Sequence, residues 1–440
     1  MANRRTSAAQ RRAAEVKKQK EKRKSRYIRR TAIVMLEVVM IGVLGICCYG
    51  VSLLNGMSDA NFRKDEIYLA PLDQPEIPDT SGFTLEVTSL EELESWVSEA
   101  QTEAATEETD APTPEETVPE TPAPVTVDHG EDEVLAAQNI TNGFWNILLV
   151  GTDARNQAEL TDGHNSDTMI VCSINVATKE IKLASIYRDT LMKMYSDGKY
   201  DKANAELAKS NYQNMLSMLN MNLDLRMTDV ILVNWAVLAN YINAIGGIWL
   251  DITPGDVEIN PAKEHTAVMQ GYITEIVRET GIPSPQIEQA GYQLCNGVWA
   301  VAYCRNRYTV DNDYERTARQ REVIGKVMDR TKELVLNGDF GVVLKALTEA
   351  CSNVLTNMIP ADIFRLAMYI TNFNIVDTCG FPFDKRGTLG TYLGVADPVV
   401  PIDFGNNVIQ LHRFLFGEDG YSPSAVVQEI SYTIRQATGF

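Results

Sequence analysis

WNILLVGTDARNQAELTDGHNSDTMIVCSINVATKEIKLASIY, residues 145–187, is the stretch that decides the fold. Its apolar runs, 145–151, 168–176 and 180–187, are short and rich in Val and Ile, which predicts β-strands. The turn-rich ATK between the last two runs predicts an antiparallel hairpin. The first run is apolar apart from Asn146 and ends in Gly151, so we expect a strand buried inside a sheet.

Helical and strand patterns alternate downstream of this stretch. DVILVNW (229–235) and IWLDI (248–252) predict further strands, and LCNGVWAVAYCRNR (294–307) predicts a helix that runs into a strand. Such alternation with local antiparallel pairs favours an α/β domain, with three α-β-α layers around a mixed central sheet. The other predicted elements are helices at 203–220, 236–245, 262–281, 315–336, 341–356, 360–372 and 405–416.

The N-terminal end has the pattern of a membrane anchor. Residues 1–30 carry thirteen Lys or Arg and two Glu, and residues 31–54 form an apolar run with one charge, Glu37. At about 1.5 Å per residue, a helix of this length spans the ~30 Å hydrocarbon core. A cleaved signal peptide is the alternative, but the run is longer than a usual signal core and no A-x-A pattern follows it. We therefore expect a cytoplasmic tail (1–30), one transmembrane helix (31–54) and an extracellular remainder.

The segment 55–138 is rich in Glu, Thr and Pro. Residues 58–133 carry twenty-two Asp or Glu against two basic residues, with almost no aromatics. This composition cannot bury enough apolar surface to offset chain entropy, and like charges keep the chain extended. We expect an extracellular stalk over 55–138, an α/β catalytic domain over 139–335, and a C-terminal extension over 336–440 packed on the same domain.

Charge balance and the Cys and His content exclude several kinds of protein. Residues 134–440 carry 34 acidic and 25 basic side chains, which argues against a nucleic-acid binder, because such proteins present a net positive face to phosphate. The four His lack ligand spacing and the seven Cys form no CxxC pair, so we expect no zinc site. We expect the Cys beyond the apolar run to be small core residues, with a Cys351–Cys379 disulfide as the alternative.

Two carboxylates stand at predicted strand ends. Asp153 directly follows WNILLVG, in GTDAR, and Asp167 directly precedes the next strand, in NSDTM. Two carboxylates without softer ligands suit Mg²⁺, or Mn²⁺, which takes oxygen ligands and shares them with substrate phosphate. The alternative is ordinary turn chemistry, since Asp is favoured in turns and at helix caps.

Arginines form a second pattern. Arg305 and Arg307 are two apart on a predicted strand, so their side chains should share a face. Arg316 and Gln320 are four apart on a predicted helix, and Arg188 ends another strand, in IYRDT. Guanidinium groups bind phosphate oxygens in bidentate fashion, so the cluster predicts a diphosphate site. A solvated charged helix face is the alternative.

Other catalytic patterns are missing from the sequence. There is no GxxxxGK[ST], hence no Walker-type nucleotide site, and no GxSxG. Phosphoryl transfer needs charge neutralisation and in-line positioning more than a covalent nucleophile. A hard cation with an arginine cluster therefore matches that chemistry.

A series of motifs then points to one family. NILLVGTDAR, NSDTMIV, IKLASIYRDT, DKANA, INAIGGIWLDI, LCNGVWAVAYCRNRY and D-x-x-R-x-x-RQR follow one another along the chain. In this order and spacing they resemble the LytR–CpsA–Psr family over about residues 143–330. Two positions depart from the family pattern: Tyr187 stands where Pro is usual, and Asn165 stands where Arg is frequent.

The resemblance implies an enzyme. Members of the family are phosphotransferases that attach teichoic acids, capsular polysaccharide or other wall glycopolymers to peptidoglycan, from an undecaprenyl-pyrophosphate carrier. It implies that Asp153 and Asp167 bind the metal, and that the prenyl chain fills a gap between sheet and helices. By resemblance the catalytic residues are Arg188, Asp189, Arg305 and Arg307, and the pyrophosphate-binding residues are Arg155, Arg188, Lys202, Arg305, Arg307, Arg316 and Gln320.

Two other functions stay open at this point. A non-catalytic membrane protein would bind the lipid-linked polymer and act as a regulator, and a pyrophosphatase would only release phosphate. Asp153 and Asp167 favour the transferase over the binding protein, because binding alone does not need a metal. A tightly closed core remains the alternative to the prenyl-filled gap.

Overall fold

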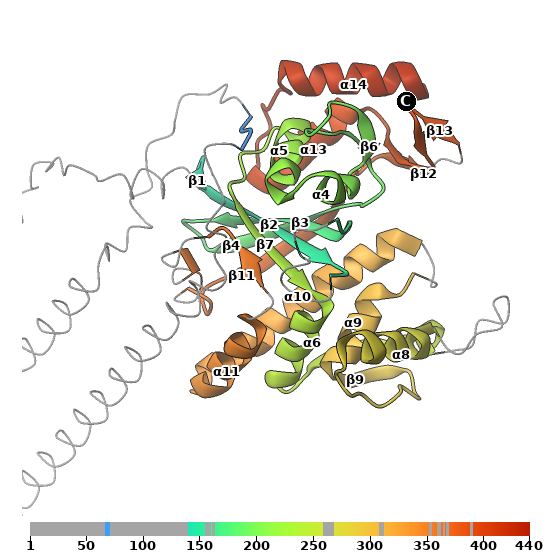
Figure 1. Cartoon of the computed structure of the whole chain (residues 1–440). Helices are drawn as coiled ribbons and strands as arrows, with labels where there is room; N and C mark the ends of the chain where they lie inside the picture. Colours follow the sequence, from blue (N-terminus) through green and yellow to red (C-terminus); the bar gives the residue numbers. More distant parts are fainter. Residues whose placement is uncertain are drawn as a thin grey trace, which may run out of the picture.

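The structure, a computed structural model, describes residues 67–70, 140–154, 160, 163–257, 268–307, 312–351, 354–358, 362–363, 366, 369–387 and 390–440 (Figure 1). The predicted tail 1–30 and anchor 31–54 lie outside these residues. Among the helices described, none is both long enough and apolar enough to cross a membrane.

A mixed sheet forms the centre of the domain. β2–β3 and β3–β4 are antiparallel, which confirms the predicted hairpin, whereas β2–β7 and β4–β11 are parallel. The predicted α/β fold with a mixed central sheet is therefore confirmed. The strand order is β10 (Leu355–Thr356), β7 (Asp229–Asn234), β2 (Phe144–Thr152), β3 (Ser166–Asn175), β4 (Glu180–Ile186) and β11 (Asn374–Phe381), and β1 (Ile140–Thr141) pairs with β2.

Helices cover both faces of the sheet (Figure 1). Along β2, Leu148 and Val150 lie in one buried cluster, whereas Ile147 and Leu149 pack into another. Successive strand residues point to opposite faces, so the two clusters fill the two sides of the sheet and give three layers. The first face is covered by α4 (Ala205–Lys209), α5 (Tyr212–Leu223), α13 (Phe404–Phe416) and α14 (Ala425–Thr438), and the second by α10 (Asn312–Leu336).

A further buried cluster lies below the sheet in Figure 1. Its two central helices, α6 and α9, are capped by Asn234 and Asn296, whose side chains accept from backbone amides of the first turn. A Cβ on Gly297 would lie 1.9 Å from the Ala239 carbonyl oxygen, so glycine lets α9 approach α6 closely. The elements here are α6 (Trp235–Ala244), β8 (Ile248–Ile252), α7 (Pro254–Val257), α8 (Val268–Thr280), β9 (Gly291–Cys295), α9 (Gly297–Arg305) and α11 (Phe340–Cys351).

Two predicted helices have different ends in the structure. The predicted helix 203–220 is divided into α4 and α5, because the Asn211 side chain caps α5 by accepting from the Asn214 amide at 2.8 Å. The predicted helix 341–356 is correct only as far as Cys351, since the chain then adds β10 to the edge of the sheet.

The C-terminal extension belongs to the same domain. β11 extends the sheet beyond β4. The sequence does not predict this strand, since Phe381 is its one fully buried residue and the apolar pattern is therefore weak. Asp224 accepts from the Ser424 amide at 2.7 Å and from its hydroxyl at 2.6 Å, which fixes the start of α14 against the end of α5. Short strand pairs complete the domain: β5 (Leu191–Lys193) with β6 (Tyr200–Lys202), β12 (Lys385–Gly387) with β15 (Val399–Pro401), and β13 (Thr391–Tyr392) with β14 (Val395–Ala396).

Residues 67–70 pack on the domain, although they fall within the predicted stalk, 55–138. Ile67 lies in the largest buried cluster. The Tyr68 amide donates to Ser217 Oγ of α5 at 3.0 Å, and the Tyr68 carbonyl oxygen accepts from a side-chain amide of the same helix at 2.9 Å. The stalk prediction is corrected here, because these apolar side chains find a surface on α5. Except for 67–70, the predicted stalk lies outside the described residues.

Candidate active site

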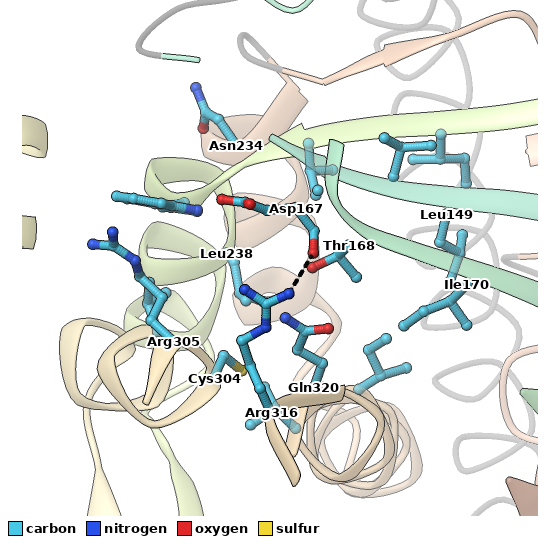
Figure 2. Close-up of a pocket in the computed structure, with 18 of the residues that line it drawn as sticks. Leu149, Asp167, Thr168, Ile170, Asn234, Leu238, Cys304, Arg305, Arg316 and Gln320 are labelled. Atoms are coloured by element: carbon cyan, nitrogen blue, oxygen red, sulfur yellow. Dashed lines mark hydrogen bonds between the residues drawn. The ribbon is translucent and has the colours of Figure 1, made fainter. Parts of the chain in front are cut away.

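A cavity of about 410 Å³ lies between the sheet and helices α6, α8, α9 and α10. Figure 2 shows Arg316 and Gln320 extending from α10 toward the sheet residue Asp167, with Arg305 of α9 at the left of the view. Apolar side chains, including Leu149, lie to one side of this polar group. The cavity therefore has a charged end and an apolar end.

A β-bulge sets the position of Asp167. Gly151 pairs with Thr168 and Thr152 pairs with Ser166, so Asp167 is an extra residue on β3. A bulge bends a strand locally and re-aims a side chain. The sequence places Asp167 just before the strand, whereas the structure places it inside β3, where it lines the cavity.

Three guanidinium groups from separate parts of the chain meet at Asp167. Arg188 Nη1 contacts Asp167 Oδ1, and Arg307 Nη2 lies 3.9 Å from the same oxygen. Arg316 Nη2 donates to the Asp167 carbonyl oxygen at 3.4 Å (Figure 2). Arg188 follows β4 and does not end it, since the strand stops at Ile186. Two of these cations contact the Asp167 carboxylate and the third contacts its backbone, so the group keeps a net positive charge that suits a phosphate.

Asp189 and Lys202 extend this charged group. Lys202 Nζ lies 3.3 Å from Asp189 Oδ1, and Arg188 Nε lies 3.9 Å from the same atom. The structure thus brings both predicted residues beside Arg188. Arg155, the remaining predicted phosphate-binding residue, lies outside the described residues.

Arg305 is the last residue of α9, and the strand predicted for it is wrong. The Asn296 cap starts the helix, and the Ala-containing run after it has no breaker before Asn306, whose ψ of 123° ends the helix. Arg305 and Arg307 still both line the cavity, because the chain turns at Asn306. The two arginines share one site as predicted, but a turn after a helix brings them together and not the alternation of a strand.

Aromatic and acidic side chains fix the Arg305 guanidinium. Its central carbon lies 3.4 Å from the centre of the Trp235 ring and 5.1 Å from that of Tyr272. Its Nη2 lies 3.2 Å from Glu275 Oε1 on α8. Its Nη1 is buried and has no hydrogen-bond partner in the described part of the chain. A buried polar atom without a partner is uncommon in proteins, and Arg305 is also a residue that lines the cavity.

Arg316 and Gln320 lie one turn apart on α10 and both line the cavity, as their predicted helical spacing requires. Arg316 is 3% exposed, so α10 holds it with little freedom. Gln320 Oε1 is buried without a hydrogen-bond partner among the residues described. α10 therefore supplies a fixed cation and an available amide to the same space.

Asp153 directly follows β2, and Asp167 lies near the start of the neighbouring strand β3. His164 Nδ1 lies 3.2 Å from Asp153 Oδ1, a contact that the motif pattern does not predict. Within the described ranges, no group of three or more Cys, His, Asp or Glu could hold a metal. Two carboxylates fit a hard cation that takes its other ligands from substrate phosphate and water.

Cys304 is the thiol that lines the cavity. Burial raises its pKa to about 12, so the thiol is neutral at pH 7 and is not a nucleophile. Cys379 is a free thiol, so the alternative of a Cys351–Cys379 disulfide is not observed. Cys172 and Cys295 are free and buried, as expected for small core residues.

The residues that hold Arg305 are not among those predicted from the sequence. Trp235 directly follows the Asn234 cap at the end of β7, where a strand end meets a helix start. That position was the available signal, because binding groups concentrate at strand ends. Glu275 and Tyr272 stand in the amphipathic pattern of α8 and carry no local signal of their own.

Comparison with known proteins gives consistent matches. The LytR_cpsA_psr family profile matches residues 98–395. Over 225 residues the chain is 27% identical to polyisoprenyl-teichoic acid–peptidoglycan teichoic acid transferase TagU of Enterococcus faecalis, covering 51% of this chain and 65% of that protein. Over 271 residues it is 24% identical to the corresponding transferase TagT of Bacillus subtilis, covering 60% of this chain and 77% of that one.

A solved structure shows the same fold. Protein gbs0355 from Streptococcus agalactiae superposes with a TM-score of 0.51 and 22% identity, covering 67% of this chain and 96% of that one. The chain spans less than two thirds of the length of the enterococcal relative, 65%. The family profile, however, covers residues 98–395, well over half of the sequence. The motifs, the fold and this match agree that the chain belongs to the LytR_cpsA_psr family.

Proposed function

We propose that this protein is a membrane-anchored phosphotransferase that moves a glycopolymer from a polyprenyl-pyrophosphate carrier to peptidoglycan. The observation that carries the proposal is the cavity, in which clustered arginines adjoin an apolar interior. A prenyl pyrophosphate has the same two parts joined covalently. The names of the enterococcal and Bacillus subtilis relatives, both teichoic acid transferases, support this substrate class.

The charged end of the cavity would bind the pyrophosphate. Arg305 offers a buried, unused Nη1 donor, and Arg307 and Arg316 line the same space. Hydrogen bonds between guanidinium and phosphate are charge-assisted and roughly twice as strong as neutral ones. Because these donors are held by protein contacts before a ligand enters, little reorganisation is needed during transfer.

The proposed reaction transfers the polymer with its phosphate. An acceptor hydroxyl oxygen attacks the phosphorus that bears the polymer, the bond from that phosphorus to the bridging oxygen breaks, and prenyl phosphate leaves. The hydroxyl proton passes to a nearby base or to water. In this proposal Arg188, whose Nε lies 3.9 Å from Asp189 Oδ1, would stabilise charge on the transferring group.

Asp153 and Asp167 would hold Mg²⁺ or Mn²⁺. A bound cation of this kind supplies neutralisation of phosphate charge. The carboxylate pair without thiolates fits it, and the absence of a third acidic or His ligand within the described ranges means that substrate phosphate would complete the site.

The apolar end would bind part of the prenyl chain. Each buried CH₂ contributes about 0.8 kcal/mol, so a few isoprene units add appreciable affinity after ordering costs. A tightly closed core, the alternative, does not fit a cavity of about 410 Å³ lined by Leu149, Ile170 and Val233. In this proposal the domain lies outside the cell membrane, and teichoic acid, capsule or another wall polymer is the group transferred.

Direct binding tests the site. We expect the Arg305→Ala/Arg307→Ala variant to bind geranylgeranyl pyrophosphate at least tenfold more weakly, because it loses two charge-assisted contacts, and to keep its affinity for geranylgeraniol. The matched control is Arg413→Ala/Arg435→Ala, which removes two exposed arginines from α13 and α14. Equal losses for both ligands in the test variant would refute the assignment of the pyrophosphate site.

Transfer itself needs a separate assay. The wild-type protein should move polymer from defined lipid-linked donors to peptidoglycan fragments. Tight binding of the lipid with no transfer to any such acceptor would support the non-catalytic binding protein, and release of phosphate without transfer would support a pyrophosphatase.

A further inference from the structure

A completely buried carboxylate lies outside the cavity, on α7. Asp256 is 0% exposed, and the cavity lining does not include it. An unpaired buried carboxylate is strongly unfavourable, so its partners are part of why it is tolerated. The Thr253 amide donates to Asp256 Oδ2 at 2.9 Å, and the Thr253 hydroxyl donates to the same atom at 2.7 Å.

The other carboxylate oxygen joins two further elements. Asn306 Nδ2 donates to Asp256 Oδ1, and Arg319 Nη1 lies 2.9 Å from the same atom. Asn306 is 0% exposed and Arg319 is 8% exposed, so both partners are buried. Within the described part of the chain, the Asp256 carboxylate thus contacts Thr253 just before α7, Asn306 just after α9, and Arg319 on α10.

Both of these partners stand next to phosphate-site residues in the sequence. Asn306 lies between Arg305 and Arg307, and its backbone turn directs both toward the cavity. Arg319 precedes Gln320 on α10 and lies one turn after Arg316. A single carboxylate thus ties together the two segments that carry the cavity's cations.

A second contact reinforces the same junction. The Arg319 guanidinium carbon lies 4.8 Å from the centre of the Tyr303 ring on α9. The Tyr303 hydroxyl donates to Glu322 Oε2 on α10 at 2.8 Å. α9 and α10 are therefore joined through the Tyr303 ring at Arg319 and through the Tyr303 hydroxyl at Glu322. Asp256 supplies the negative charge beside Arg319.

We infer that Asp256 is a positioning residue that sets the spacing of the pyrophosphate-binding arginines by holding Asn306 and Arg319. The inference rests on the proposed function, because it assigns a role toward that same site. Asp256 touches neither the cavity nor the ligand in this arrangement. It acts through the end of α9 and through α10.

The test compares a charged with an uncharged ligand. Asp256→Asn removes the negative charge and replaces one of the two acceptor oxygens by an NH2 donor. We expect affinity for geranylgeranyl pyrophosphate to fall about tenfold, the effect of misplacing one or two charge-assisted contacts, while affinity for geranylgeraniol changes less than about twofold. A general loss of structure would weaken both ligands together.

The matched control is Asp229→Asn. Asp229 is also 0% exposed, and it accepts from Trp145 Nε1 at 2.7 Å. It begins β7, about 16 Å along the strand from Asn234 at the cavity. This variant should keep the wild-type ratio of the two affinities, even if both fall slightly. A changed ratio in the control would overturn the inference.

A second variant covers the case in which Asp256→Asn fails to fold. Asp256→Leu/Arg319→Met replaces the buried ion pair by apolar side chains of similar size, a change that proteins often tolerate. It should fold and still lose the preference for the pyrophosphate. Wild-type preference in a folded variant would overturn the role of Asp256. No preference in the wild-type protein itself would instead refute the proposed pyrophosphate site.

Discussion

At the scale of single residues, Arg305 shows how far the site is organised without a ligand. Its guanidinium packs 3.4 Å above Trp235, and one of its amino groups is 3.2 Å from Glu275. These contacts restrict a side chain that otherwise has many rotamers, so little side-chain conformational entropy is left to lose when a ligand binds. Arg305 therefore lines the cavity in an orientation that these contacts fix.

Asp153 and Asp167 carry the first prediction. Asp153→Ala and Asp167→Ala should lose divalent-cation-dependent turnover while keeping the fold, because carboxylates at strand ends add little to the core. Turnover measured against Mg²⁺ concentration, together with circular dichroism, checks both parts. Asp167→Ala should have the larger effect, since Asp167 also contacts Arg188. Wild-type transfer rates in both variants would show that the metal role is wrong.

The cavity residues that could be predicted from the sequence are those that stand in a recognisable motif. Asp167, Arg305, Arg307, Arg316 and Gln320 all line one space in the structure. The residues that hold them are not predictable in the same way. Their contacts join segments far apart in the chain, such as α7 with α10, and no local pattern records such a pairing.

At the scale of helices and strands, the close approach of α9 to α6 carries the second prediction. Gly297→Ala places a Cβ 1.9 Å from the Ala239 carbonyl oxygen, so the backbone must shift, which should cost about 1–3 kcal/mol of unfolding free energy. Denaturant unfolding of the detergent-solubilised protein measures it. Pyrophosphate binding should also weaken, because α9 carries Arg305 at its far end.

The matched control for this prediction is Gly271→Ala on α8. A Cβ there meets nothing within 4 Å, so the change should raise the unfolding free energy by about 0.5–1 kcal/mol through helix propensity. If Gly297→Ala were as stable as this control, tight packing of α9 on α6 would not be the reason for the glycine.

Elements that depart from the sequence prediction do so for tertiary reasons. The segment 294–307 is predicted to pass from helix into strand, but it stays helical through Arg305, since the Asn296 cap starts α9 and α9 packs on α6. Tyr187 replaces the family's Pro, and a Cβ on Gly380 of β11 would lie 2.1 Å from its hydroxyl. The glycine on a distant strand thus makes room for the tyrosine, which a local pattern does not show.

At the scale of the whole molecule, orientation in the membrane is the third prediction. The basic segment 1–30 should be cytoplasmic and residues 58–440 extracellular, because positive charge flanks one side of the apolar run. Protease added to intact protoplasts should digest the domain and leave an epitope placed within 1–30 protected. Protection of the domain, or loss of the N-terminal epitope, would contradict this topology.

The attachment of residues 67–70 to α5 changes how the chain is connected mechanically. With the predicted anchor ending at Leu54, the connection to the bilayer is the segment 55–66, whose contour length is at most about 40 Å. The acidic segment 71–139 begins and ends on the same folded body, so it is no part of the connection between that body and the bilayer. Lengthening or shortening 71–139 therefore leaves the maximum height of the cavity above the lipid surface unchanged, whereas each residue added to 55–66 raises that limit by about 3.5 Å.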